Sequence, residues 1–332
     1  MSKQGILIIL FVCKGFLLSG QQSSQEIATP KAIKMLLDQG KLIEARSQIL
    51  KMPKEAQSSP ESLELIGDIY GGLKRWDSAL IYYERFKDID PKNPAGPFKY
   101  GGALGMKALS KNKFTALMYL DDIKASFQKS VDLDPTYVAA HWALIEYYFQ
   151  VPSFMGGGVD RAMQQADALY AVSPVDGLMA RARVAEEDED LGAAEQNYRQ
   201  AVDTGQSLWA YKELISFYER HKRWDSAFDQ LKTAMTKFDD LSLNYQWAKM
   251  SVLSDKYATQ GRNYIAECLG PTAKVEGIPE QWIRLRYAQL LRKTGQNKTA
   301  LEQVNLALVL DANFEQAKEE QRILQKILNT IK

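Results

Sequence analysis

Histidine and cysteine are scarce in this sequence, with only two residues of each among 332. A metal site or a nucleophilic triad needs several such side chains to converge, but His141 and His221 lie far apart in the chain. We therefore predict no metal, no cofactor and no enzymatic activity, and we expect both histidines at the surface or on a helix flank. An enzyme on an unusual helical scaffold stays open as an alternative.

Charge of one sign is not in excess either. The 42 Lys and Arg residues face 41 Asp and Glu residues, which gives a net charge of +1, and no long run of Lys and Arg occurs. A protein that binds nucleic acid needs a basic patch or stripe, so we predict no nucleic-acid partner. The acidic run from Glu186 to Asp190 is expected to be a solvated turn, with binding of a cation or a basic partner as the alternative.

Long apolar runs are absent after the first twenty residues, MSKQGILIILFVCKGFLLSG. In that stretch a basic start at Lys3 precedes the apolar residues 6–12, and the small residues Ser19 and Gly20 precede a polar segment. This order is typical of a secretion signal, and the run is too short and too interrupted for a comfortable membrane span. We predict a signal peptide over residues 1–20 and an exported mature chain, periplasmic or secreted, without a transmembrane span.

Cys13 offers a different interpretation of the same stretch, as a lipid-attachment cysteine. Such signals require a small residue just before the cysteine, and Val12 is not small. A lipid anchor, an uncleaved anchor and the absence of export stay open beside simple cleavage. If the signal is removed, Cys268 is the one remaining thiol, so the fold must rest on packing without an internal disulfide. We expect Cys268 to be a small core residue.

What the sequence does contain is a helical repeat, which is clearest between Glu61 and Pro91. Apolar residues recur there at steps of three and four, first at Leu63, Ile66, Ile69, Tyr70 and Leu73 and then at Trp76, Ala79, Leu80, Tyr83 and Phe86. This period predicts two amphipathic helices joined by a tight turn, and the proline ends the second helix. Because such a hairpin cannot bury its own faces, it has to stack on neighbours and form a solenoid.

The spacing of five residues in this hairpin is the most specific motif of the chain. Tyr70, Ala79, Tyr83 and Pro91 follow Gly67 at offsets of 3, 12, 16 and 24 positions. At these residues, and in the recurrence of the unit near every 34 residues, the sequence resembles the tetratricopeptide repeat family. The resemblance implies an all-α fold, a right-handed α-solenoid of helical hairpins that binds a protein or peptide along its concave face without catalysis.

Variants of this unit fill residues 21–332, which we interpret as one solenoid domain. We predict hairpins at 26–59, 60–93, 94–137, 138–174, 175–206, 208–241, 242–277 and 281–314, and a capping helix at 314–331. About ten extra residues lie near KNKFTALMYL and about five near VPSFMGGG, relative to the repeat period. The segment 242–277 matches the repeat worst, and both a distorted hairpin and a break between two halves stay open.

In this family the concave face is lined by first-helix residues that point away from the second helix of the hairpin. Mapped onto this chain, the offsets give the partner-groove candidates Trp142, Glu146, Phe149, Arg183, Lys212, Tyr245, Lys249, Arg286, Gln289 and Arg292, with Met179 and Ser216 on the same face. Aromatic and arginine side chains are the usual anchors of protein interfaces. We hypothesise that the basic members attract an acidic or C-terminal peptide segment, with an ordinary solvated surface as the alternative.

The main prediction is therefore a non-enzymatic scaffold or adaptor for a protein or peptide. The spacers are similar to those of an exported bacterial subgroup of these repeat proteins, which carries no settled activity. A second hypothesis is an accessory of an envelope transport system, which would enclose a ligand-sized apolar cavity and form oligomers. The identity of the partner and the oligomeric state stay open.

Overall fold

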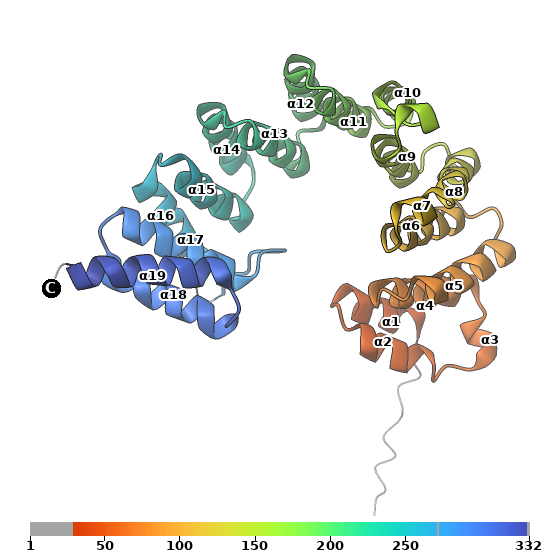
Figure 1. The fold of residues 1–332 in the computed structure, drawn as a ribbon, viewed down its shortest axis with the longest axis horizontal. Coiled ribbons are helices and arrows are strands. Elements are labelled where there is room, and N and C mark those ends of the chain that lie inside the picture. The colour runs from red at the N-terminus through yellow and green to blue at the C-terminus, as the bar shows by residue number, and fades with distance from the viewer. Residues whose placement is uncertain (1–28, 271, 331–332) are drawn as a thin grey trace, which may run out of the picture.

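The computed structural model describes residues 29–270 and 272–330, and over these ranges the chain is helical without a β-strand. Successive helices pack as antiparallel pairs, and the pairs follow one another along an open arc from the N-terminal to the C-terminal end (Figure 1). The prediction of an all-α solenoid is confirmed. The predicted signal peptide at 1–20 and Cys13 lie outside the described residues.

The first half of the arc contains four hairpins and three short additional elements, α3, α7 and η1. Its helices are α1 (Pro30–Asp38), α2 (Leu42–Ile49), α3 (Lys54–Gln57), α4 (Pro60–Gly72), α5 (Trp76–Ile89), α6 (Ala95–Leu109), α7 (Lys113–Leu117), α8 (Leu120–Leu133), α9 (Val138–Gln150) and α10 (Val159–Val172), with the 3₁₀ helix η1 (Ser153–Met155) before α10. None of the described helices combines the length and the apolar character that a membrane crossing needs.

The second half continues the same pairing and ends in a single helix. Its helices are α11 (Pro174–Glu187), α12 (Leu191–Gly205), α13 (Leu208–Arg220), α14 (Trp224–Lys237), α15 (Leu241–Ser254), α16 (Ala258–Glu267), α17 (Glu280–Lys293), α18 (Asn297–Leu310) and α19 (Glu315–Thr330). The last helix packs Ala317 and Leu324 onto the final hairpin, as a cap on the end of a solenoid requires.

Gly67 of the repeat motif marks the closest crossing between α4 and α5. A Cβ atom added at Gly67 would lie 2.3 Å from the ring of Tyr83, so only a residue without a side chain fits this position. Gly67 and Tyr83, which are 16 positions apart in the motif, therefore form the two sides of one contact. An equivalent contact occurs between Gly101 on α6 and Phe127 on α8, where a Cβ atom added at Gly101 would lie 2.9 Å from the Phe127 ring. In the sequence, the inserted residues lie between these two positions.

The turns of two hairpins also repeat at the level of the backbone. The segment KRWDSA occurs at 74–79 and again at 222–227. Lys74 and Lys222 both have a positive φ, of 57° and 53°, and the following arginine amide donates in each turn to a tyrosine carbonyl at 2.8 Å. Equal sequences thus give equal turns in both hairpins.

Two insertions and one irregular segment interrupt the period. The extra residues near KNKFTALMYL form α7, and those near VPSFMGGG form η1 and a glycine turn, where Gly156 and Gly158 have φ of 92° and 104°. Within 242–277, α15 and α16 form a hairpin with a shortened second helix. Cys268 and Val275 are buried in one cluster with residues of α17, so the apolar core continues from this segment into the next hairpin.

The core runs along the whole array because small residues stand where helices cross. Ala79, Ala194, Ala227 and Ala300 are completely buried. His141 is buried as well, only 2% exposed, and its ring bonds to the carbonyl of Pro135 at 2.9 Å. The expectation of a surface or flanking position is therefore wrong for His141, because Pro135 and Gln165 supply the polar partners that let an imidazole leave the solvent.

Candidate functional site

The ten groove candidates lie on the first helices of five consecutive hairpins, and none of them is fully buried. Helix α9 carries Trp142, Glu146 and Phe149, α11 carries Arg183, α13 carries Lys212, α15 carries Tyr245 and Lys249, and α17 carries Arg286, Gln289 and Arg292. The structure gathers six of them into two separate pockets and leaves Phe149 and the three on α17 outside both.

The first site, which we term the α9–α13 pocket, has a volume of about 240 Å³. It is lined by Trp142, Glu146, Met179, Arg183, Tyr198, Trp209 and Glu213. Tryptophan side chains from α9 and α13 contribute to its wall, and Trp209 is 41% exposed. Sequence reasoning missed the α13 contribution, although Trp209 and Glu213 are four residues apart and therefore share one face of that helix.

Charges in the α9–α13 pocket are unevenly paired. The guanidinium of Arg183 donates to Glu187 at 2.9 Å and lies 5.3 Å from the centre of the Phe149 ring. Within residues 29–270 and 272–330, neither the carboxylate of Glu146 nor that of Glu213 takes part in a side-chain hydrogen bond or an ion pair. The pocket therefore presents two carboxylates without a directly paired cation beside indole rings.

The second site, which we term the α13–α15 pocket, has a volume of about 310 Å³. It combines the candidates Lys212, Tyr245 and Lys249 with Ile215, Ser216, Ser242, Leu243, Gln246, Glu276 and Ile278. Its two lysines are engaged, since Lys249 pairs with Glu219 at 2.6 Å and Lys212 lies 3.7 Å from Asp240. This pocket is consequently close to neutral.

Of the three candidates on α17, Arg292 contacts the capping helix α19, whereas Arg286 and Gln289 contact residues of α17 itself. Arg286 donates to Gln289 at 2.9 Å and lies 5.7 Å from the centre of the Trp282 ring. Arg292 forms an ion pair with Glu320 of α19, whose side chain is only 3% exposed. Arg292 thus holds the capping helix in place, and its prediction as a groove residue is not supported by this contact.

Two larger hollows lie elsewhere on the array. One, of about 520 Å³, is lined mainly by charged and proline residues of α5, α6 and α8 and the loops beside them, and the other, of about 630 Å³, lies between α14, α15 and α16. Neither contains a groove candidate or a tryptophan. In the part of the chain that the structure describes, no group of three or more His, Cys, Asp or Glu side chains could hold a metal ion.

Comparison with known proteins agrees with this architecture. The sequence profile described as Tetratricopeptide repeat matches residues 60–93, which is the α4–α5 hairpin, and the chain superimposes on yeast Tom70 with a TM-score of 0.54. The chain has the fold of a tetratricopeptide repeat protein. The superposition covers 82% of this chain and 57% of Tom70 at 14% identity, and it supports the fold alone.

Two bacterial tetratricopeptide repeat proteins of known structure are also similar in outline. One, from Parabacteroides merdae, is 13% identical, with 89% of this chain and 96% of that chain covered and a TM-score of 0.45. The other, a thermophilic protein of Thermus thermophilus, is 20% identical over 58% of this chain and 98% of that chain, with a TM-score of 0.43. No curated protein sequence matches the chain significantly.

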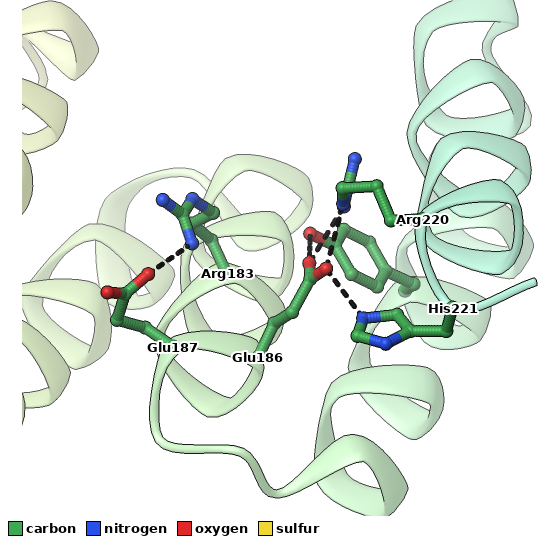
Figure 2. A network of polar contacts seen from close by, with 6 residues as sticks. Arg183, Glu186, Glu187, Arg220 and His221 are labelled. Atoms are coloured by element: carbon green, nitrogen blue, oxygen red, sulfur yellow. Dashed lines mark hydrogen bonds and ion pairs between the residues drawn. The ribbon is translucent and has the colours of Figure 1, made fainter.

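Within this fold, the acidic run Glu186–Asp190 is not a simple solvated turn. The side chain of Glu186 is only 9% exposed, and it accepts hydrogen bonds from Arg220, from the Tyr198 hydroxyl at 3.1 Å and from the His221 ring at 2.9 Å. Figure 2 shows Arg220 and His221 reaching the carboxylate from the neighbouring hairpin, while Arg183 turns toward Glu187.

The ionisation of Glu186 reflects opposing effects. Burial raises the pKa of the carboxyl, but hydrogen bonds from Arg220 and His221 outweigh it and hold the pKa below its usual value. The carboxylate therefore stays charged and ties α11 to α13. Arg183, Lys212 and Lys249 are likewise paired with carboxylates of the same chain. Nearly every cation along the groove therefore already has a partner, which argues against the hypothesis that free cations there attract an acidic segment.

Proposed function

We propose that this protein is a non-enzymatic scaffold that binds a protein or peptide along the concave face of its solenoid. The observation that carries the proposal is the α9–α13 pocket, where first helices of three consecutive hairpins bring partly exposed Trp142 and Trp209 together with Met179. Tryptophan is enriched among the residues that dominate binding energy in protein interfaces. A rigid array can present such anchors to an extended partner without first ordering them.

Site-specific photocrosslinking tests this function directly. We would place p-benzoylphenylalanine at Phe149 on α9 and, as a matched aromatic control, at Tyr170 on the second helix α10 of the same hairpin. The proposal expects a discrete adduct with a cellular protein at the first position and none at the second, followed by identification through mass spectrometry. Equal adducts at both positions, or none at the first, would contradict binding along the groove.

The alternative of a transport accessory lacks support of its own. Such a protein would enclose an apolar cavity, whereas charged side chains line part of each of the four pockets described above. A scaffold explains open, mixed surfaces better, because polar rims around a few apolar anchors are the usual anatomy of a protein interface.

We further propose that the scaffold acts outside the cytoplasm, as the character of residues 1–20 suggests. Cell fractionation of the native host with N-terminal sequencing tests this proposal, and the expected chain begins close to residue 21. Lipid labelling of a Cys13→Ser variant separates simple cleavage from a lipid anchor. A chain that begins at Met1 and stays in the cytosol would refute export.

A further inference from the structure

The α9–α13 pocket has more negative charge than its own cations can neutralise. Its lining contains Glu146 and Glu213 but only one cation, Arg183, which is committed to Glu187. Behind the pocket, the hydroxyl of Tyr198 is held by Glu186, whose charge Arg220 compensates through two hydrogen bonds. Two arginines thus stand against four glutamates, which leaves an excess of two negative charges at the pocket.

The longer-range interaction between Arg220 and Glu213 does not remove this excess of negative charge. The pKa of Arg220 is raised mainly by its hydrogen bond to Glu186 and also, at longer range, by Glu213. Even so, Arg220 and Glu213 form no ion pair in the described part of the chain. The Nε and Nη2 groups of Arg220 both donate to the carboxylate of Glu186. Glu213 therefore stays available to a ligand.

The apolar part of the lining favours the same kind of ligand. A cation placed over the face of a tryptophan ring is attracted by the ring quadrupole, and tryptophan is the best residue for this contact. The two indoles can cover the alkyl stem of a long basic side chain while the carboxylates receive its charged end. The volume of about 240 Å³ is below the range of ordinary small-molecule pockets, roughly 300–1,000 Å³, and suits one inserted side chain.

From this combination we propose that the α9–α13 pocket binds an arginine or lysine side chain of the partner protein, through Glu146 and Glu213 with Trp142 and Trp209 as walls. This inference rests on the proposed scaffold function and adds the chemistry of the partner. It is opposite in sign to the acidic segment expected from the sequence, since the basic residues of the groove are occupied by carboxylates of the same chain.

Fluorine NMR with model peptides tests the pocket on the intact chain labelled with 5-fluorotryptophan. The probes are three acetylated and amidated peptides, Gly-Ser-X-Ser-Gly, in which X is arginine, its neutral analogue citrulline, or glutamate. Variants Trp142→Phe and Trp209→Phe assign the two resonances. We expect the arginine peptide to shift both resonances with saturation, and the citrulline and glutamate peptides to bind at least about tenfold more weakly, as the loss of a charge-assisted hydrogen bond implies.

Three further variants sharpen the test. In Glu146→Gln/Glu213→Gln the arginine peptide should lose its advantage over the citrulline peptide, whereas Glu276→Gln, a matched change in the α13–α15 pocket, should leave it unchanged. Arg183→Gln removes the one cation of the lining and should strengthen binding of the arginine peptide. Equal binding of the arginine and citrulline peptides, or unchanged selectivity in the double glutamine variant, would overturn the proposal.

The outcome also separates this proposal from the scaffold function. A partner that crosslinks at Phe149 but binds equally well to the double glutamine variant would refute the cationic anchor and leave the scaffold intact. If no adduct forms at Phe149 and the wild-type protein does not bind the arginine peptide, both the scaffold function and the cationic anchor are refuted. Unchanged far-ultraviolet circular dichroism of each variant confirms that the comparison concerns the pocket and not the fold.

Discussion

The guanidinium of Arg220 binds the carboxylate of Glu186 with two parallel hydrogen bonds, of 2.8 and 2.7 Å, across a sequence separation of 34 residues. That separation is one repeat, so the pair joins the first helices of adjacent hairpins. Similar links span 28 to 38 residues in the pairs Lys99–Asp68, Arg223–Glu195, Lys249–Glu219, Lys293–Asp255 and Arg292–Glu320. Ion pairs between neighbours therefore supplement the apolar core of the array.

Glu186→Gln should weaken the link between α11 and α13. The change removes the charge that three donors share at a site only 9% exposed, so we expect the free energy of unfolding in urea to fall by about 2 kcal/mol. The matched control is Glu187→Gln, whose side chain is 47% exposed in its pair with Arg183 and should cost less than about 0.5 kcal/mol. Equal losses in the two variants would contradict the structural role of Glu186.

Acid should weaken the contacts of Glu195. Hydrogen bonds from Arg223, together with smaller effects of Tyr218 and Arg199, lower the pKa of this carboxyl to about 2 from its ordinary 4.5. Because the folded pKa is depressed, the stabilisation is present above about pH 4.5 and is lost as the pH falls toward 2. Glu195→Gln should be less stable than the wild type at pH 7, by roughly 1–2 kcal/mol, and the difference should vanish near pH 2. Thermal melts of both proteins across this range decide the point, and a constant difference would refute it.

Gly177→Ala should damage the contact between α10 and α11. A Cβ atom at Gly177 would lie 2.1 Å from the backbone Cα of Tyr170, which cannot move aside as a side-chain tip can. We expect a loss of about 1–3 kcal/mol in the free energy of unfolding. As a control, Gly102→Ala in the interior of α6 meets nothing within 4 Å and should raise stability by roughly 0.5–1 kcal/mol. The two variants should therefore change the free energy of unfolding in opposite directions. A Gly177→Ala variant as stable as the wild type would contradict the close packing of α10 against α11.

Cys268 should resist thiol reagents until the chain opens locally. The side chain is only 3% exposed, and burial raises the pKa of its thiol to about 11, which leaves little thiolate at pH 8. In a Cys13→Ser variant, where Cys268 is the one thiol, maleimide labelling should be slow in buffer and fast in concentrated urea. The labelling rate then measures opening of the shortened α15–α16 hairpin. Rapid labelling in buffer would contradict the burial of this segment.

Part of the candidate site could be predicted from the sequence. The repeat offsets placed Trp142, Glu146 and Arg183 on one face of successive first helices, and these three residues do share a pocket. The same offsets chose Lys212 to represent α13, although Trp209 and Glu213 are the α13 residues that reach this pocket. The offsets assign a few fixed positions to each helix, whereas the rotation of a helix about its axis decides which neighbouring positions complete a pocket.

The charges were harder to predict. Glu186 stands in a run of five acidic residues that is typical of a solvated turn, and Arg292 has the spacing of a groove residue. Their true environments come from Arg220 and Glu320, which lie 34 and 28 residues away. Local composition contains no information about which distant carboxylate will meet which guanidinium.

The sequence by itself determined the helices, their pairing and the stacking of the pairs, because apolar periodicity and small residues such as Ala79 and Gly67 act over a few residues of one hairpin. Only the tertiary structure decided which charges remain available to a partner. That outcome depends on contacts between hairpins one repeat apart, where Glu219 engages Lys249 and no cation in the described chain pairs with Glu213. Electrostatic pairing is set by distances of a few ångströms, which only the packed array defines.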